Sequence, residues 1–169
     1  MTVDAHKTHT VKCVRCAVVT VSDTRTAAND ASGRRIRELL AGAGHVVQSH
    51  CIVRDDPSDI AGRAQQLVGS GEVEAVILNG GTGLALRDAT VEAIRPLLAK
   101  EIAGFGELFR YLSYAEVGSA AMLSRATAGV TKGVIVICLP GSPAAVELAM
   151  TKLVLPEIGH MVFLARGGG

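Results

Sequence analysis

Apolar and polar residues alternate along this chain in blocks whose lengths suit strands and helices in turn. Short apolar runs rich in β-branched residues predict strands at 17–21, 46–53, 74–78 and 133–139. Between the strands, apolar residues recur at helical spacing, and Ser32, Ser58 and Thr90 stand where the N-caps of three helices are expected. Pro96 is expected to kink or shorten the third of these helices.

The second half of the chain extends this pattern less regularly. A long apolar helix is predicted from Ala144, interrupted by Pro156 before a last helical stretch through Phe163. Residues 101–128 have a less clear pattern, with helical spacing at first and a run of small residues afterwards.

Repeated strand–helix units predict an α/β fold, a three-layer α/β/α arrangement with a mostly parallel central sheet in a single compact domain. Hydrophobic residues make up 49% of the sequence and aromatic residues only 3%, so the core must be built from Val, Ile, Leu and Ala. That composition suits buried parallel strands covered by helices. We expect the domain to span residues 15–166, after a flexible N-terminal tail at 1–14.

A polar or glycine-rich cluster follows each predicted strand at its C-terminal end. Asp23 and Asp55 follow the first two strands, and a sharp turn at Pro140 follows the last one. The third strand opens into the run Asn79-Gly80-Gly81-Thr82-Gly83, with Asp88 a few residues further on. Parallel strands end at one edge of their sheet, where α/β proteins bind ligands, so these clusters are expected to converge there.

The glycine run favours an anion, because glycine lets backbone N–H groups approach a phosphate without an intervening side chain. It is not a P-loop, since the sequence has no Gly-Lys pair, and Leu86 occupies the third glycine position of the dinucleotide motif. Asp55 and Asp88 beside phosphates suit Mg²⁺. From spacing alone an alternative stays open, in which Asp55 caps a helix and Asp88 closes a turn.

Charge and hydropathy argue against two classes of partner. A formal net charge of +1 does not suit an electrostatic grip on nucleic acid or on anionic lipid. No stretch approaches the length needed to span a bilayer, and the first twelve residues lack the apolar core of a signal peptide. We therefore expect a cytoplasmic protein that binds neither nucleic acid nor membrane.

Isolated reactive residues add little chemistry. Cys13 and Cys16 form a C-x-x-C that precedes the first strand, and no second pair completes a zinc site. The five histidines are scattered and are interpreted as solvated or incidental, and the lack of a Gly-x-Ser-x-Gly motif disfavours a serine hydrolase. Glu107 and Arg110 suit either a surface ion pair or contact of the arginine with an anionic group.

Taken in order, these motifs resemble the MoaB and Mog group of small molybdopterin-binding proteins over residues 18–160. The matching segments are Val21-Ser22-Asp23-Thr24-Arg25, Asp30 with Ser32-Gly33, Asn79-Gly80-Gly81-Thr82-Gly83, Arg87-Asp88-Ala89-Thr90 with Glu92-Ala93, Gly104-Phe105-Gly106-Glu107, Leu123-Ser124-Arg125-Ala126 and Leu139-Pro140-Gly141-Ser142-Pro143. The last two segments and the lack of a further domain favour MoaB over its larger relatives. Val91 departs from the pattern, since the family commonly has proline after the threonine.

The resemblance implies a protein of molybdenum cofactor biosynthesis that binds molybdopterin. Active members adenylylate the terminal phosphate of this pterin with Mg-ATP and release pyrophosphate, so ATP and molybdopterin would be substrates and Mg²⁺ the cofactor. Asp55 and Asp88 match the family's essential acidic positions and are the implied catalytic and Mg²⁺-binding residues. The residues implied to bind the phosphates and the pterin are Ser22, Asp23, Gly80, Gly81, Thr82, Gly83, Ser113, Pro140, Gly141 and Ser142.

Three functions follow from these observations. The first is a molybdopterin adenylyltransferase, and the second is a carrier of the same pathway that holds the pterin without turning over nucleotide. The third is a scaffold, prompted by the small-residue run Gly118-Ser119-Ala120-Ala121, which suits a subunit contact. A scaffold ranks last because it has no need for acids and glycines after the strands. The resemblance also implies a homo-oligomer, a trimer or a hexamer.

Overall fold

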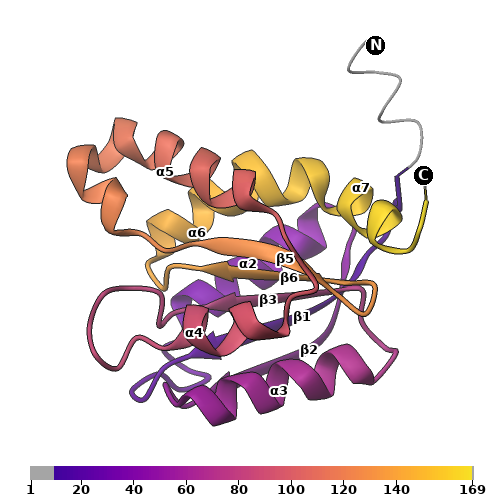
Figure 1. The fold of residues 1–169 in the computed structure, drawn as a ribbon, viewed down its shortest axis with the longest axis horizontal. Coiled ribbons are helices and arrows are strands. Elements are labelled where there is room, and N and C mark those ends of the chain that lie inside the picture. Colours follow the sequence, from indigo (N-terminus) through magenta and orange to yellow (C-terminus); the bar gives the residue numbers. More distant parts are fainter. Residues whose placement is uncertain (1–9, 169) are drawn as a thin grey trace.

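The chain forms one six-stranded sheet covered by helices on both faces, in a computed structural model that describes residues 10–168 (Figure 1). The strands are β1 (Arg15–Val21), β2 (Val46–Val53), β3 (Ala75–Asn79), β4 (Lys100–Glu101), β5 (Thr127–Thr131) and β6 (Val134–Leu139). They lie in the order β2-β1-β3-β6-β5-β4, in which the first four run parallel and β5 and β4 form antiparallel pairs at one edge. The predicted α/β fold with a mostly parallel sheet is confirmed.

The helices form the two outer layers. They are α2 (Ala31–Gly42), α3 (Pro57–Gly69), α4 (Thr90–Ile94), α5 (Ala103–Val117), α6 (Pro143–Ala149) and α7 (Leu155–Ala165), with 3₁₀ turns η1 (Arg95–Leu97) and η2 (Gly118–Leu123) and a π-helical turn η3 (Met150–Val154). The helices α2, α5, α6 and α7 cover one face of the sheet, whereas α3 and α4 cover the other (Figure 1). Pro96 follows the short helix α4 and lies in η1, as predicted.

Successive residues of each parallel strand point to opposite faces of the sheet, and both faces are buried. In β1, Val18 packs in the core under α2, α5, α6 and α7, whereas Val19 packs in the core under α3 and α4. In β3, Ile77 and Leu78 divide in the same way. Burial on both sides explains why these strands are continuously apolar in the sequence.

The segment with the unclear sequence pattern forms α5, η2 and the two edge strands β4 and β5. The strand β5 reads Thr-Ala-Gly-Val-Thr, which is too poor in large apolar residues to stand out as a strand. Gly129 is required there by β4, because a β-carbon at this position would lie 2.5 Å from the carbonyl oxygen of Lys100. The pattern of apolar residues alone therefore misses this edge of the sheet.

Two of the predicted helix caps are wrong by two residues. Asp30, and not Ser32, is the N-cap of α2, and its carboxylate accepts a hydrogen bond from the backbone N–H of Gly33. Asp56, and not Ser58, is the N-cap of α3 and accepts from the backbone N–H of Ser58. In both cases an aspartate two residues before the serine satisfies the free amides of the first turn.

The C-terminal helix is longer than predicted. Pro156 does not interrupt it, because the wider π-helical turn η3 lies directly before the proline, which then falls in the first turn of α7. The stretch Pro143–Ala165 is long and apolar enough to cross a bilayer by length and composition, so the expectation that no stretch reaches that length is wrong. Val146, Ile158 and Val162 are nonetheless fully buried against the sheet, as in the core helix of a globular domain.

Residues 10–14 pass along α7 before β1 begins. The backbone N–H of Val11 donates to the carbonyl oxygen of Gly159, at 3.1 Å, and Val14 is fully buried. The described part of the segment expected to be a tail is thus packed against the domain, and residues 1–9 lie outside the described residues. Cys16 is also buried, which raises the pKa of its thiol to about 12, whereas Cys13 is exposed.

Candidate functional site

The C-terminal ends of β1, β2, β3 and β6 meet at one edge of the sheet. The chain leaves β1 towards β2 on one side, while β3 lies on the other side, so the strand order reverses between β1 and β3. Such a reversal opens a crevice at the sheet edge. The glycine run 80–83 lies at this point, directly after β3. We call residues 80–83 with Asp55, Asp88 and Thr90 the phosphate rim.

Gly80 and Gly81 are required by their backbone angles and by close neighbours. Their φ values are 103° and 61°, in the region that favours glycine. A β-carbon on Gly80 would lie 2.3 Å from the carbonyl oxygen of Val21, and one on Gly81 would lie 2.8 Å from Asp55 Oδ1. The turn therefore presses against the end of β1 and against the loop after β2, which brings these distant segments together.

Thr90 is a brace for this turn and not the helix cap predicted for it. It is fully buried, its hydroxyl donates to the carbonyl oxygen of Gly80 at 2.8 Å, and its N–H donates to the carbonyl oxygen of Gly81 at 3.0 Å. Ala89 stands at the N-cap position of α4 without a side-chain hydrogen bond. The hydroxyl of Thr90 therefore stabilises the glycine turn and does not cap the helix.

Arg125 holds the other half of the loop. Its Nε donates to the carbonyl oxygen of Thr82 at 3.2 Å, its Nη2 donates to the carbonyl oxygen of Asp88 at 3.1 Å, and its Nη1 pairs with Glu92. One planar guanidinium thus ties both ends of the segment that carries Asp88. Sequence reasoning gave Arg125 no role, although the residue stands within the matching segment Leu-Ser-Arg-Ala.

Asp55 lies against the glycine turn with one oxygen unused. Its Oδ1 is shielded from solvent and has no hydrogen-bond partner in the described part of the chain. Burial raises the pKa of Asp55 above its ordinary value, and the charges of Asp88 and Asp23 act in the same direction, against the N–H of Ala89 and the charge of Arg87. The alternative that Asp55 caps a helix is wrong, since Asp56 caps α3.

Asp88 lies on the same rim but has a structural contact as well. Its Oδ2 accepts a hydrogen bond from the N–H of Ala85 at 3.0 Å, so it does close the turn that spacing left open as an alternative. A β-carbon on Gly83 would lie 2.6 Å from this oxygen. Asp23 belongs to the same group, because its Oδ1 accepts from the N–H of Asp55 at 3.2 Å. The structure therefore brings Asp23, Asp55 and Asp88 together.

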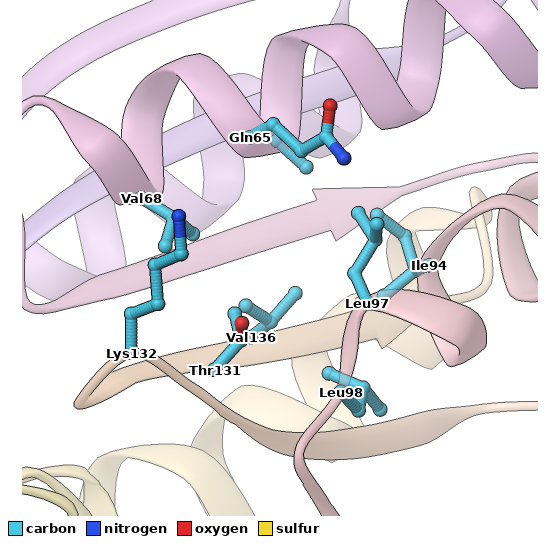
Figure 2. A pocket seen from close by; sticks show the side chains of 9 residues that line it. Gln65, Val68, Ile94, Leu97, Leu98, Thr131, Lys132 and Val136 are labelled. Carbon is cyan, nitrogen blue, oxygen red and sulfur yellow. The ribbon is translucent and has the colours of Figure 1, made fainter.

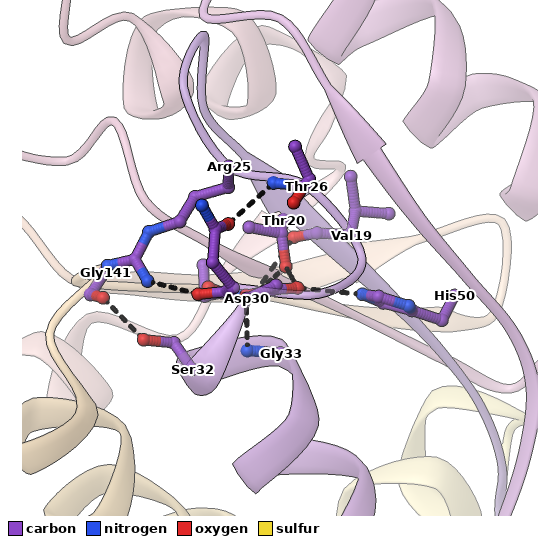
Figure 3. Close-up of polar contacts among 11 residues, drawn as sticks. Val19, Thr20, Arg25, Thr26, Asp30, Ser32, Gly33, His50 and Gly141 are labelled. Atoms are coloured by element: carbon purple, nitrogen blue, oxygen red, sulfur yellow. Dashed lines mark hydrogen bonds and ion pairs between the residues drawn. The ribbon is translucent and has the colours of Figure 1, made fainter.

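Beside the rim lies a polar cavity of about 170 Å³, here called the Asp30 cavity. Its lining residues are Thr20, Val21, Ser22, Arg25, Asp30, Ser32, Asn79, Gly80 and Gly141. Figure 3 shows how Asp30 gathers contacts at its base: Thr20 Oγ1 donates to Asp30 Oδ2 at 2.7 Å, and His50 Nε2 lies 3.0 Å from the same oxygen. Sequence reasoning missed this network, because its members come from β1, β2 and the start of α2.

Asp30 is only 2% exposed, yet it is ionised more readily than a free aspartate. Burial alone would raise its pKa, but the hydrogen bonds from Thr20, Gly33 and His50 outweigh burial and lower it. The interpretation of the histidines as solvated or incidental is therefore wrong for His50. His45 also has a partner, since its Nδ1 accepts from the N–H of Val14.

Ser22 and Gly141 line the Asp30 cavity through loop contacts. Ser22 Oγ accepts from the backbone N–H of Arg25 at 3.1 Å. Ser32 Oγ donates to the carbonyl oxygen of Gly141 at 2.6 Å, which ties the turn after β6 to α2. A β-carbon on Gly141 would lie 3.1 Å from the Cα of Gly80, so the two turns touch.

The remaining predicted binding residues lie in a separate cavity of about 190 Å³, here called the Ser113 cavity. Ser113, Pro140 and Ser142 line it, between α5, η2 and the start of α6. Ser113 Oγ donates to the carbonyl oxygen of Phe109, and Ser142 Oγ accepts from the N–H of Ala145 as the cap of α6. The turn 140–142 thus borders the Ser113 cavity with two residues and the Asp30 cavity with Gly141.

Arg110 has no ion pair with Glu107 among the described residues. Its Nη1 donates weakly to the carbonyl oxygen of Ser124, at 3.4 Å, and the guanidinium lines a polar cavity of about 440 Å³ beside Arg125. The surface ion pair left open by the sequence is therefore absent from this region.

A sequence profile described as a probable molybdopterin binding domain matches residues 17–160. The chain therefore belongs to this family of molybdopterin-binding domains, as its motifs predicted. It is similar to molybdenum cofactor biosynthesis protein B of Halalkalibacterium halodurans, with 50% identity over 163 residues and 96% of each chain covered.

Solved structures agree with this assignment. A crystal structure of molybdenum cofactor biosynthesis protein B superimposes with a TM-score of 0.90 at 51% identity, covering 92% of this chain and 98% of that one. The tungsten cofactor synthesizing protein MoaB from Pyrococcus furiosus superimposes with a TM-score of 0.84 at 36% identity, covering 92% of this chain and 99% of its own. The resemblance to the MoaB group is confirmed.

Proposed function

We propose that the protein acts in molybdenum cofactor biosynthesis by binding molybdopterin and adenylylating its terminal phosphate with Mg-ATP. In this reaction a phosphate oxygen of molybdopterin forms a bond to the α-phosphorus of ATP, and the bond to the leaving pyrophosphate breaks. The observation that carries the proposal is the unpartnered Oδ1 of Asp55, which lies against the glycine turn of the phosphate rim.

Asp55 and Asp88 would hold Mg²⁺ at the rim together with phosphate oxygens. The fit is supported by Asp55, whose shielded oxygen lacks a partner and whose pKa is raised by burial and by neighbouring negative charge. A cation relieves both conditions. The described residues contain no group of three or more His, Cys, Asp and Glu suited to a metal, so the ion would depend on substrate oxygens and water, as Mg²⁺ commonly does. Bound there, it would neutralise charge on the phosphates.

The chain's own residues would position the phosphates at the rim. Gly80 and Gly81 let the backbone turn tightly against Val21 and Asp55 at the rim, and Thr90 and Arg125 keep this backbone in place. Transfer of a nucleotidyl group needs alignment of the reacting oxygen and stabilisation of charge, and it needs no covalent nucleophile from the protein. Thr82 is buried and would act through its carbonyl contact with Arg125.

The pterin would occupy the Ser113 cavity. This cavity is lined largely by apolar atoms, and its polar positions are Ser113, Glu116, Ser124 and Ser142. Such a lining suits a flat heterocycle with a few hydrogen-bonding groups. The turn 140–142 borders both this cavity and the Asp30 cavity beside the rim. A molecule with a pterin at one end and a phosphate at the other could therefore reach from the Ser113 cavity to the glycine turn.

A second candidate is a carrier that binds the pterin without turning over nucleotide. It is favoured by Asp88, whose Oδ2 already accepts a hydrogen bond from Ala85 and is less available to a metal. The carrier predicts pterin binding that does not depend on Mg-ATP.

We also propose that the protein is a cytoplasmic homo-oligomer, a trimer or hexamer. The support lies on α5, where Leu108, Tyr111, Tyr114 and Val117 recur every three residues and are each more than half exposed. An apolar stripe of this kind is a common feature of subunit contacts. Sedimentation that shows only monomer at micromolar concentration would contradict it.

The test of the enzyme is direct. The purified protein is incubated with molybdopterin, ATP and Mg²⁺, and adenylylated pterin and pyrophosphate are measured, with Asp88→Asn as the inactive variant and Asp59→Asn as its matched control. Asp59 is an exposed aspartate in the first turn of α3. Product from the protein and from Asp59→Asn, but not from Asp88→Asn, is expected. Tight pterin binding without product would support the carrier instead.

A further inference from the structure

A cavity of about 320 Å³ lies on the face of the sheet covered by α3 and α4 (Figure 2). Its lining residues are Ala64, Gln65 and Val68 of α3, Ile94, Leu97 and Leu98 at and after the end of α4, and Thr131, Lys132 and Val136 around the β5–β6 hairpin. We call it the hairpin cavity.

The hairpin cavity is separate from the phosphate rim. The helix α3 begins next to Asp55, but the cavity is lined by its later residues 64–68, and α4 begins at Thr90 but lines the cavity with Ile94 at its other end. Val136 likewise lies in the first half of β6, whereas the rim lies at the end of that strand. The cavity is therefore at the opposite end of the same two helices.

The floor of the hairpin cavity is apolar and its edge is polar. Ala64, Ile94 and Val136 are each at most 2% exposed, so they form a dry base. Among the described lining residues, Lys132 alone carries a charge, and the amide of Gln65 lies on the α3 side (Figure 2). A largely apolar pocket with a few polar groups at its edge is the usual form of a small-molecule site.

Lys132 is a cation without a partner at this edge. Within the described residues its ammonium makes no ion pair or hydrogen bond, and its side chain extends from the hairpin towards Val68 of α3 (Figure 2). Its backbone has a φ of 48°, in the left-handed region, where glycine or asparagine is the ordinary choice for a two-residue hairpin turn. The turn itself therefore has no need for a lysine.

We propose that the hairpin cavity binds a small aliphatic carboxylate. The hydrocarbon part lies on Ala64, Ile94 and Val136, where it removes apolar surface from water. The carboxylate accepts hydrogen bonds from the Lys132 ammonium and the Gln65 amide, and a bond between two charged groups is stronger than one between neutral groups. This site is independent of the reaction proposed above, because none of its residues belongs to the phosphate rim.

The test is a titration of the full-length, isotope-labelled protein with sodium hexanoate, followed by NMR. Amide shifts are expected to change in three separate segments, 64–68, 94–98 and 131–136, with one common dissociation constant. Hexanol and hexylamine serve as matched probes with the same hydrocarbon part. Both are expected to bind about tenfold or more weakly than hexanoate, since hexanol offers Lys132 only a neutral acceptor and hexylamine is itself a cation without an acceptor.

Two variants separate charge from shape. Lys132→Met keeps most of the aliphatic stem and is expected to weaken hexanoate binding about tenfold, whereas Lys152→Met, on the exposed side of η3, is expected to leave it unchanged. Shift changes spread elsewhere, or none up to millimolar hexanoate, would overturn the proposal. Equal binding of hexanoate and hexylamine to the unmodified protein would overturn the role of Lys132, even if Lys132→Met failed to fold.

Discussion

The carboxylate of Asp55 lies against the backbone of Gly81, so closely that a β-carbon on the glycine would sit 2.8 Å from Asp55 Oδ1. These residues are 26 positions apart and come from the loops after β2 and β3. Thr90 packs against Gly81 as well, since a β-carbon on Gly81 would lie 2.5 Å from Thr90 Oγ1. The phosphate rim is therefore packed around a position where only glycine fits.

Gly81→Ala is expected to destabilise the protein and abolish phosphate binding. The new methyl group would collide with Asp55 and Thr90, and an alanine at a φ of 61° is strained as well, for a combined cost of about 1–3 kcal/mol in the free energy of unfolding. Chemical denaturation measures this cost. Gly62→Ala, inside α3 with nothing within 4 Å, is the control and is expected to stabilise by about 0.5–1 kcal/mol. Equal stability of the two variants would contradict this account.

Asp55→Asn is expected to remove turnover without weakening the fold. Burial, together with the charges of Asp88 and Asp23, raises the pKa of Asp55, so its ionised form opposes folding. This unfavourable contribution grows as the pH rises from the ordinary value of 3.8 through the raised pKa, and it is complete above the raised pKa. A neutral amide avoids it.

The measurements for Asp55→Asn are a product assay and thermal unfolding at neutral pH. We expect a loss of turnover of about a hundredfold or more, with a melting temperature equal to or above that of the parent protein. A melting temperature well below the parent would mean that the carboxylate stabilises the native loop, contrary to its unpartnered Oδ1.

The parallel half of the fold could be predicted from the sequence, whereas the antiparallel edge could not. The strands β1, β3 and β6 are buried on both faces and are therefore unbroken apolar runs, which stand out. The edge strand β5 is short and contains Gly129, because β4 approaches its backbone closely. Gly129 is needed because of a neighbouring strand, so the sequence of β5 itself shows no apolar pattern that would predict it.

The candidate site was predictable where its residues directly follow the ends of strands, and it was not predictable where they lie within strands and helices. The glycine run and the two acids follow strand ends, so their convergence follows from the parallel topology. The Asp30 network joins Thr20, His50 and Gly33 from three elements, and only the folded chain brings them together. Thr90 was expected to cap α4, but the nearby carbonyl of Gly80 takes its hydroxyl instead.

Asp30→Asn is expected to destabilise the protein in a pH-dependent way. Hydrogen bonds from Thr20, Gly33 and His50 lower the pKa of Asp30 despite its burial, so the ionised group stabilises the fold at any pH above the ordinary aspartate value of 3.8. Loss of bonds to a charged acceptor is expected to cost about 1–3 kcal/mol at neutral pH. The difference in unfolding free energy between parent and variant should shrink as the pH falls through the lowered pKa. A difference that stayed constant with pH would assign the cost to packing alone.

Arg125→Lys is expected to loosen the loop that carries Asp88 while leaving the sheet intact. A lysine ammonium is a point donor and cannot reach the carbonyl oxygens of Thr82 and Asp88 in the fixed fork that the guanidinium provides. We expect faster amide hydrogen exchange over residues 82–90 and a turnover lower by about tenfold, because the acid is less well positioned. The control is Arg95→Lys, since Arg95 makes an exposed ion pair with Glu101 and, within the described residues, makes no hydrogen bond or ion pair with residues 82–90. If Arg125→Lys exchanged no faster than Arg95→Lys yet lost turnover, the arginine would act on the substrate directly and not through the loop.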